Sequence, residues 1–430
     1  HIHILGDSHY KALNLTAANG MWIRANVSTN RGDLNLEGNG DDRTVININI
    51  GPEIGIHAYN GSIFLQKSQE ANITLTTPAS WSSSENITIM TPLLIEGEGK
   101  FDILTDSNVD GVGLPDVWDS ANITIWGTEG KELYINAADI NFGWHVDLLQ
   151  TNLNIRTSRA TETINLGKDD GGGLTLTDSE IDRVHTTGNI TIGSSSDILI
   201  RMSGLTYETQ STTFSLISDK LEVHGKPTRI TTDVKLRTNS SIYVTDDLTV
   251  TGTLHVTTDS NCDGKGNLYV KEDASIAVEN QYTTITTNDI VLNGTISTGS
   301  VPLKISTCRA ANLGIGGEGS AVGQLVLDRN ELRRIRCSNV TIANLGGSVH
   351  MQYVNFRDSV SLTGVVIAQR GQVAVPPTFP VEESASFPAL VAYTRRSSVR
   401  IEDDLEVTRG NLEIRDYLYV NITQGTNLVS

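Results

Sequence analysis

A three-strand pattern that recurs along the chain restricts the possible folds more than any other feature of this sequence. Its first copy runs through Ile87–Ile89 and Leu93–Ile95, turns at a glycine and ends at Phe101–Ile103. The same pattern starts again at Ile242 and at Val399. Apolar and polar residues alternate in each copy, which is the period of a half-buried β-strand. Regular repeats of short strands predict a repetitive architecture and not a set of separate globular cores.

A second repeated phrase lies between these copies. Gly173–Val184 precedes the strand-like segment Asn189–Gly193, and Gly323–Ile335 precedes the similar segment Asn339–Ile342. The offset is roughly 150 residues in each family of repeats, so the chain reads as nearly three copies of one long unit. Two independent repeats with the same offset indicate duplication of a whole block of structure.

These repeats predict an all-β fold, a right-handed parallel β-helix (β-solenoid) that runs continuously through residues 1–430. Its three-strand coils would contain about 20–25 residues each. Strands would lie on their equivalents one coil away, with Ile, Val and Leu stacked in columns inside. An aromatic content of only 5% agrees with such a narrow interior. The Pro-rich segment 371–392 is predicted to form a loop excursion, because proline cannot donate a hydrogen bond within a strand ladder.

The repeated phrases resemble those of a known protein family. Gly173–Gly193, and Leu13–Ile23 with Gly32–Leu36 after it, are similar to repeats of large filamentous-haemagglutinin-like proteins. The resemblance implies a long right-handed β-helix that is secreted as an adhesin or as a component of a surface fibre. It therefore implies an extracellular or cell-surface location.

The charge and hydropathy of the chain exclude several partners. It carries 32 Lys and Arg against 50 Asp and Glu, which gives a net charge of −18. This acidic balance disfavours nucleic acids and anionic membranes, since both require clustered basic residues. No apolar stretch approaches the roughly 18 residues that a membrane span needs. The sequence starts at His1 without a signal-peptide pattern, so we expect a processed chain or a segment of a longer one.

We expect a structural or adhesive function without catalysis. The chain would be a rod-like segment of a surface filament or fibre, such as a flagellar hair or another surface appendage. Its partners would be further copies of itself or other filament subunits. The candidate catalytic carboxylates are the paired aspartates Asp246–Asp247, Asp403–Asp404 and Asp169–Asp170. Most of these occupy repeated bends, whereas a catalytic cleft should occur once and break the repeat.

Two alternative functions stay open. The first is a carbohydrate-binding or polysaccharide-cleaving β-helix module, for which Trp118, Trp126 and Trp144 are the aromatic residues to consider. The second is a host-cell adhesin that acts through specific side chains. The tripeptide Arg31-Gly32-Asp33 matches an integrin-recognition motif, although Gly and Asp at this place are also ordinary residues for the start of a strand.

Two acidic loops are candidate calcium sites. Each places oxygen-bearing side chains at alternate positions before a glycine: Asp106, Asn108 and Asp110 in the first loop, and Asp259, Asn261 and Asp263 in the second. Calcium prefers such oxygen ligands, and glycine at the sixth place permits a sharp turn. Neither loop has an acidic residue at its twelfth position, so a plain Asx-rich turn is the alternative interpretation. Calcium is the one cofactor that the sequence suggests.

The three cysteines are Cys262, Cys308 and Cys337, and their spacing does not match a zinc site. Cys308 and Cys337 are separated by roughly one coil plus a loop. Equivalent positions on adjacent coils lie close to the Cα separation that a disulfide requires. We therefore predict a disulfide between Cys308 and Cys337, with Cys262 free or linked between chains.

Asn-x-Ser/Thr sequons recur along the chain and are glycosylation candidates. They begin at Asn14, Asn26, Asn60, Asn72, Asn86, Asn122, Asn189, Asn239, Asn293, Asn339 and Asn421. Many stand at the start of an expected strand, on an outward corner where a glycan would fit. If the source is eukaryotic, several of them should carry N-linked glycans. In a bacterial protein they would reflect only the Asn-, Ser- and Thr-rich composition.

Overall fold

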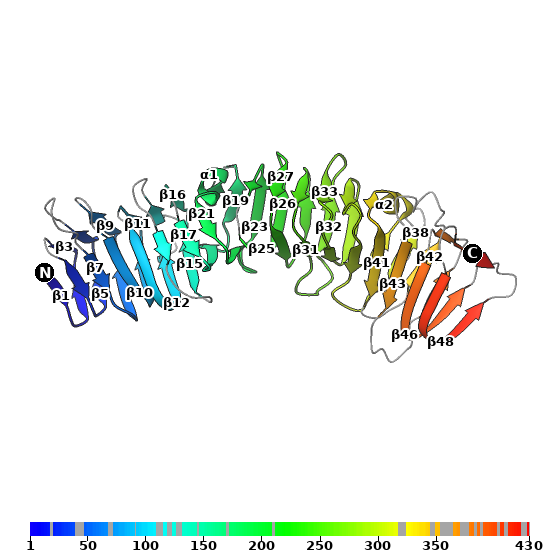
Figure 1. Ribbon diagram of the computed structural model, residues 1–430, viewed down its shortest axis with the longest axis horizontal. Coiled ribbons are helices and arrows are strands. Elements are labelled where there is room, and N and C mark those ends of the chain that lie inside the picture. Colours follow the sequence, from blue (N-terminus) through cyan, green and yellow to red (C-terminus); the bar gives the residue numbers. More distant parts are fainter. Residues whose placement is uncertain are drawn as a thin grey trace. The chain divides into compact units, whose positions relative to one another are not determined.

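The computed structural model describes most of the chain (Figure 1). The described residues are 1–17, 20–38, 47–67, 72–90, 92–108, 115–117, 123–125, 131–143, 146–168, 172–208, 211–316, 324–344, 349–352, 364–369, 378–381, 385–387, 390–401, 405–407, 412–422 and 428–429. They form stacked parallel strands with two short helices, which confirms the predicted all-β parallel β-helix. The chain divides into two compact units, residues 1–218 and 219–430, and each is described by itself.

The first unit is built from short strands and one helical turn. Its elements are β1 (Ile2–Ile4), β2 (Ser8–Tyr10), β3 (Leu13–Ala17), β4 (Met21–Ile23), β5 (Val27–Thr29), β6 (Leu34–Gly38), β7 (Asn47–Ile50), β8 (Ile54–Ala58), β9 (Ile63–Lys67), β10 (Asn72–Ser83), β11 (Ile87–Ile89), β12 (Leu93–Leu104), β13 (Pro115–Val117), β14 (Ile123–Ile125), β15 (Glu132–Ala137), β16 (Asn141–Phe142), β17 (Val146–Leu149), β18 (Asn152–Thr157), β19 (Thr163–Gly167), β20 (Leu174–Thr177), α1 (Asp178–Ile181), β21 (Val184–Thr186), β22 (Asn189–Gly193), β23 (Leu199–Ser203), β24 (Thr206–Tyr207) and β25 (Thr213–Ser218).

Each strand of the first coils pairs with the strand three places further along the chain, which is its equivalent in the next coil. β1 pairs with β4 and β4 with β7, while β2 pairs with β5 and β5 with β8. The third face follows with β3, β6 and β9. All of these pairings are parallel and in register, so the backbone donors and acceptors are satisfied along the stacking direction. The predicted three-strand coil is therefore confirmed for this part of the chain.

Aliphatic columns fill the interior of the first unit because inward positions alternate with outward ones along each strand. Leu34, Ile63 and Ile87 occupy one column, on the β6, β9 and β11 register, and all three are fully buried. Larger side chains also enter the interior: Trp81 of β10 lies against Phe101 of β12, with ring centroids 5.0 Å apart in an edge-to-face arrangement.

The second unit repeats the same construction. Its elements are β26 (Lys220–Val223), β27 (Thr228–Ile230), β28 (Asp233–Thr238), β29 (Ile242–Val244), β30 (Leu248–Val250), β31 (Leu254–Thr257), β32 (Asn267–Val270), β33 (Ser275–Val278), β34 (Thr283–Thr286), β35 (Asp289–Leu292), β36 (Thr295–Ser297), β37 (Leu303–Ser306), β38 (Leu313–Gly316), β39 (Leu325–Leu327), α2 (Arg329–Arg333), β40 (Ile335–Arg336), β41 (Asn339–Asn344), β42 (Val349–Gln352), β43 (Gly364–Gln369), β44 (Thr378–Val381), β45 (Ala385–Phe387), β46 (Leu390–Ile401), β47 (Leu405–Val407), β48 (Leu412–Ile422) and β49 (Leu428–Val429).

Coil length varies although the strand register is kept. Thr253 donates its backbone N–H to the Asp233 side chain across one coil, a separation of 20 residues. In the first unit, Asn189 makes the corresponding contact to Asn152 over 37 residues, because that coil contains β20 and α1 in addition to three strands. The predicted coil of about 20–25 residues therefore describes the shorter coils, and extra residues are accommodated outside the ladders.

The predicted loop excursion at 371–392 differs from the structure in part. Within this range, β44 and β45 are strands, and β46 begins at Leu390. β44 pairs with β46 in parallel, with Pro380 opposite Arg400. A proline nitrogen carries no hydrogen, so Pro380 occupies this position without donating a backbone hydrogen bond to the ladder. Residues 371–377, 382–384 and 388–389 lie outside the described part of the chain.

Thr228→Val is expected to raise the free energy of unfolding of the second unit by about 1 kcal/mol. Thr228 is 1% exposed, and its hydroxyl has no hydrogen-bond partner among the described residues. Its column continues with Leu248 and Ile276, so valine keeps the shape and removes an unsatisfied polar group. Urea unfolding followed by circular dichroism measures the change.

Thr238→Val is the matched control, because Thr238 is equally buried but its hydroxyl donates to the Ser240 carbonyl at 2.9 Å. We expect this variant to lower the free energy of unfolding by about 1 kcal/mol. Equal destabilisation by both substitutions would contradict the account of Thr228.

Candidate functional site

The helical corner at α1 positions a cavity in the first unit. Thr177 ends β20 and caps α1: its backbone N–H and its hydroxyl both donate to Oε2 of Glu180, at 2.9 and 2.7 Å. The Glu180 side chain thereby satisfies the backbone N–H at the start of the helix, as in a capping box. Ile181 then points into the core, 4% exposed, and the chain returns to the ladder as β21. The corner is therefore fixed at both ends.

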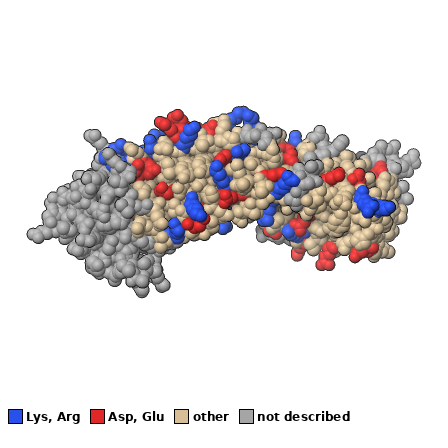
Figure 2. All heavy atoms as spheres, turned by 180° about the vertical axis from the view of Figure 1, so that it is seen from behind, with Lys and Arg blue, Asp and Glu red and all other residues tan. Residues whose placement is uncertain are grey.

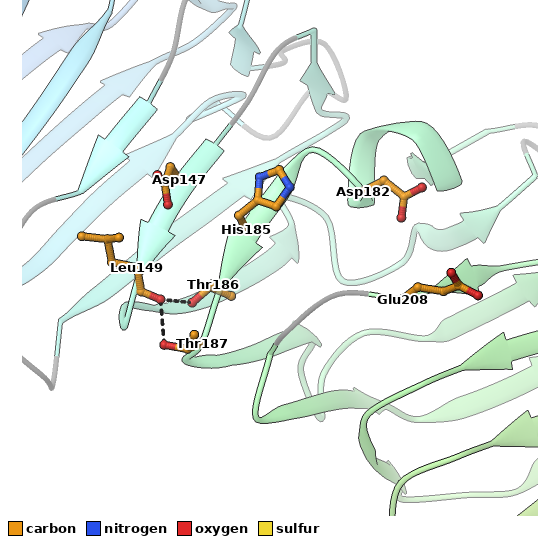
Figure 3. Close-up of a pocket in the computed structure, with 7 residues that line it drawn as sticks. All are labelled: Asp147, Leu149, Asp182, His185, Thr186, Thr187 and Glu208. Atoms are coloured by element: carbon orange, nitrogen blue, oxygen red, sulfur yellow. Dashed lines mark hydrogen bonds between the residues drawn. The ribbon is translucent and has the colours of Figure 1, made fainter. Parts of the chain in front are cut away.

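A pocket of about 500 Å³ lies beside this corner (Figure 3). Its lining comes from β17, the end of α1, β21 and the residue that follows β24. The lining residues are Asp147, Leu149, Asp182, His185, Thr186, Thr187 and Glu208. Three carboxylates and one imidazole therefore define its ionisable groups.

Strand pairing explains how two of these groups come together. β17 and β21 are parallel neighbours, and Asp147 stands directly opposite His185. The register then shifts before Leu149, which has a positive φ of 48°. Its carbonyl accepts hydrogen bonds from the hydroxyls of Thr186 at 3.2 Å and Thr187 at 3.1 Å, as drawn in Figure 3. The threonines thus hold the backbone, and the carboxylates set the charge of the pocket.

The pKa of Asp182 reflects the negative charge of the pocket. Partial burial raises the pKa of this carboxyl above its ordinary value. The negative charges of Asp178 and Glu208 raise the pKa further, and His185 opposes them. Like charges within reach of one another favour the protonated form, and they would also favour an incoming cation. The pocket is therefore suited to a positively charged group such as a guanidinium or an ammonium.

The second unit contains a corner of the same design at α2. Glu331 accepts a hydrogen bond from the Asp328 backbone N–H at 2.9 Å, and Asp328 accepts one from the Glu331 N–H at 2.8 Å. Behind the helix, Arg334 donates to the Leu292 carbonyl at 3.0 Å, as Arg183 does to Phe142 behind α1. The repeated phrase of the sequence therefore builds the same local structure twice.

The two corners differ in charge. Ser297 and Arg336 are opposite each other on β36 and β40, where the first unit has Asp147 and His185 on β17 and β21. The α2 corner also carries Arg329, Arg333 and Arg334 on its short helix and the residue after it. Arg333 and Arg336 are exposed. A common backbone thus presents a negative pocket in one unit and a positive surface in the other.

Glu331 connects α2 to the preceding coil through both carboxylate oxygens. Besides the contact to Asp328, its Oε1 accepts the Leu292 backbone N–H at 2.9 Å. Burial raises the pKa of Glu331 to about 7, and the negative charges of Asp328 and Asp289 add to the rise, although the two backbone donors oppose it. Burial raises the pKa of Asp289 as well.

We expect the free energy of unfolding of the second unit to increase by about 3 kcal/mol as the pH falls from about 7 to 4.5. In this window the folded state binds a proton at Glu331 and the unfolded state does not, so lower pH favours folding. Above pH 7 both states are ionised and the full penalty of burying the charge is present. Urea unfolding at a series of pH values measures the slope.

Asp328→Thr copies the cap of α1, where Thr177 donates a hydroxyl to Glu180. We expect this variant to have a flatter pH profile between 4.5 and 7 than the wild type, because a negative neighbour is replaced by a donor. A slope that is unchanged in Asp328→Thr and also in Glu331→Gln would assign the pH dependence to other groups.

The leading aspartates of the two predicted calcium loops already accept hydrogen bonds from other protein groups. Asp106 and Asp259 are fully buried with positive φ values of 56° and 54°. Asp106 accepts the Ser158 hydroxyl at 2.5 Å, and both carboxylate oxygens of Asp259 accept the Gly264 N–H, at 2.9 and 3.0 Å.

The remaining residues of the second loop are also engaged within it: Asn261 accepts the Asp263 N–H, and Asp263 accepts the Lys265 N–H. In the part of the chain that the structure describes, which excludes Asp110 but includes Asn108, no three His, Cys, Asp or Glu side chains are arranged to hold a metal ion. Calcium binding stays a prediction.

The disulfide differs from the predicted one. Cys308 is bonded to Cys262, with Cα atoms 5.7 Å apart, and Cys337 is a free, buried thiol. Cys308 follows β37 whereas Cys337 precedes β41, so they are not equivalent although these strands pair. The loop after β31 instead carries Cys262 past the β34 coil toward Cys308. Burial raises the pKa of the Cys337 thiol to about 11.

The sequons fall into three groups. The side chains of Asn14, Asn26, Asn60, Asn189 and Asn293 are exposed, and those of Asn86, Asn239 and Asn339 are half-buried. Asn122 and the side chains of Asn72 and Asn421 lie outside the described part of the chain. The exposed asparagines have room for a glycan, and glycosylation in a eukaryotic source stays a prediction.

The Arg-Gly-Asp tripeptide takes part in the ladder as a turn. The Asp33 carbonyl accepts the Leu13 N–H at 3.0 Å, and the Asp33 carboxylate accepts the Ser62 N–H at 2.9 Å. This carboxylate therefore stabilises the coil, whether or not it also contacts another protein.

The other residues considered for catalysis or sugar binding are only partly described. Asp247 accepts the Ser275 hydroxyl at 2.6 Å and donates its N–H to Asp246, which is typical of a corner. The pairs Asp403–Asp404 and Asp169–Asp170, and Trp118, Trp126 and Trp144, lie outside the described residues.

Sequence reasoning missed the α1 pocket. Its carboxylates come from segments that are not adjacent in sequence, and only the pairing of β17 with β21 brings Asp147 to His185. The repeated Thr/Asp-x-x-Glu phrase before an apolar residue was the available signal, because it is a capping box and marks both corners.

Comparison with models of protein families, with curated proteins and with solved structures gave no match to this chain. The observed structure defines the class, a protein of stacked parallel strands that form a β-helix. No helix among the described residues is long and apolar enough to cross a membrane.

Proposed function

We propose that the chain is a segment of an extracellular structural or adhesive protein, a part of a surface filament or fibre of the filamentous-haemagglutinin-like kind. The observation that carries this proposal is the repeated parallel coil within each unit, with columns of buried Ile, Val and Leu in its interior. Fibres are commonly built from repeats of this type because each coil contacts mainly its neighbours.

The described surface agrees with a structural role. In Figure 2, Lys and Arg lie interspersed with Asp and Glu among many uncharged residues, so the face in view carries no broad band of one sign. Outward positions on the strands are largely Thr, Asn and Ser with scattered charges. Such a surface stays hydrated while local patches remain available for contacts with other subunits.

Electron microscopy of native material, labelled with gold-conjugated antibodies against this chain, tests the proposal. We expect label along fibres at the cell surface or in the medium, at a regular spacing set by the length of the subunit. Label confined to dispersed compact particles, or to the cell interior, would contradict it.

A further inference from the structure

We propose that two copies of this chain bind each other through the two helical corners, with the α2 corner of one copy seated on the α1 pocket of the other. The acidic corner consists of Asp147, Asp182, His185 and Glu208, and the basic corner of Arg329, Arg333 and Arg336. The inference deepens the proposed function, because a fibre requires contacts between subunits.

The shared backbone makes the two surfaces comparable. Each corner is a short helix that follows a short strand, begins at a capping box and is followed by a two- or three-residue strand. An arginine after each helix donates to a carbonyl of the preceding coil. The two corners therefore share a backbone structure and differ in their surface side chains. The α1 corner is acidic, and the α2 corner is basic.

Size and exposure permit the contact. The pocket of about 500 Å³ is large enough for the ends of two arginine side chains. Asp182, His185 and Glu208 are exposed at its rim, and Arg333 and Arg336 are exposed at the α2 corner. Guanidinium groups pair with carboxylates through two parallel hydrogen bonds, which gives such contacts geometric specificity. Figure 3 shows that Asp182 and Glu208 lie on one side of the pocket, with Asp147 and His185 on the other.

A second copy of this chain is the partner whose charge complements the acidic pocket. The pocket needs a cationic surface, and this acidic chain with 50 Asp and Glu against 32 Lys and Arg concentrates four arginines within residues 329–336. The contact joins two different patches, so in a bound pair one copy keeps its acidic corner and the other keeps its basic corner for further partners. Heterologous contacts of this kind produce open-ended assemblies when they do not close into a ring.

Sedimentation velocity of the full-length chain over a range of concentrations tests the proposal. We expect wild-type protein to self-associate, and the association to weaken as salt is raised, because ions screen surface charges. The double variants Asp182→Lys with Glu208→Lys, and Arg333→Glu with Arg336→Glu, should each weaken self-association at least tenfold. Circular dichroism confirms that each variant is folded.

Mixing the two variants is the decisive measurement. Each variant alone brings together corners of the same sign, whereas a mixture offers lysines on one chain to glutamates on the other, so association should return. Lys235→Glu with Arg237→Glu makes the same change of charge on exposed residues of β28 and should associate like the wild type.

Three outcomes would overturn the proposal: a wild-type chain that is monomeric at every concentration, corner variants that associate normally, or a mixture that fails to associate. The fibre function is judged separately by microscopy of native material. Fibres with unaffected corner variants would leave that function standing and place the subunit contact elsewhere.

Discussion

Trp81→Ala is expected to lower the free energy of unfolding of the first unit by about 4 kcal/mol. Trp81 is fully buried in β10, and its ring meets Phe101 edge-to-face at 5.0 Å. Removing it leaves a cavity between two columns that are held in place by strand pairing, so the neighbours cannot collapse into the space. Urea unfolding followed by far-ultraviolet circular dichroism measures the loss.

Trp81→Phe separates packing from polarity at the same position. The indole N–H of Trp81 has no hydrogen-bond partner among the described residues, so phenylalanine sacrifices volume but no hydrogen bond. We expect a cost of about 1–2 kcal/mol, well below that of alanine. If phenylalanine were as destabilising as alanine, the interpretation of this site as a packing site would fail.

Cys262→Ser is expected to lower the free energy of unfolding of the second unit by about 4 kcal/mol, because the disulfide to Cys308 closes a loop in the unfolded chain. The bonded residues are 46 apart in sequence. A loop of that size loses much conformational freedom when it is closed, so breaking the bond stabilises the unfolded state. Denaturant unfolding of wild type and variant under oxidising conditions measures the difference.

A reducing agent provides the control for this bond. Reduction should destabilise the wild type by a similar amount and leave Cys262→Ser and Cys308→Ser unchanged. Cys337→Ala should keep the response to reduction, because Cys337 is a free thiol in the core. A wild-type protein whose stability is indifferent to reductant would refute the stabilising role of the bond.

Much of the fold was predictable because the alternation of apolar residues maps directly onto burial. Ile242 and Val244 are buried while Tyr243 between them is only partly so, and the same alternation holds in β30 and β31. The sequence has a helical rhythm over Asp178–Ile192, but the second half of this stretch contains β-branched residues, and the structure places β21 and β22 there. Only its first turn is helical, as α1.

The disulfide and the pocket could not be predicted because both depend on coil length. The pairing of Cys262 with Cys308 requires a loop that passes an intervening coil, and sequence spacing does not reveal which loop does so. Similarly, Asp147 reaches His185 only because β18, β19, β20 and α1 lie between β17 and its partner strand β21. Local patterns identify strands, but they do not reveal how many residues lie outside the strand ladders between two paired strands.

Corners that vary in length while the ladders keep their register make this protein a suitable host for foreign peptides. The 17 additional residues that separate the 37-residue contact from the 20-residue one are carried without a break in the pairing of β18 with β22. A grafted epitope or enzyme tag at such a corner would be displayed away from the hydrophobic columns. In evolution, the same tolerance lets small insertions create new recognition surfaces while the supporting framework stays intact.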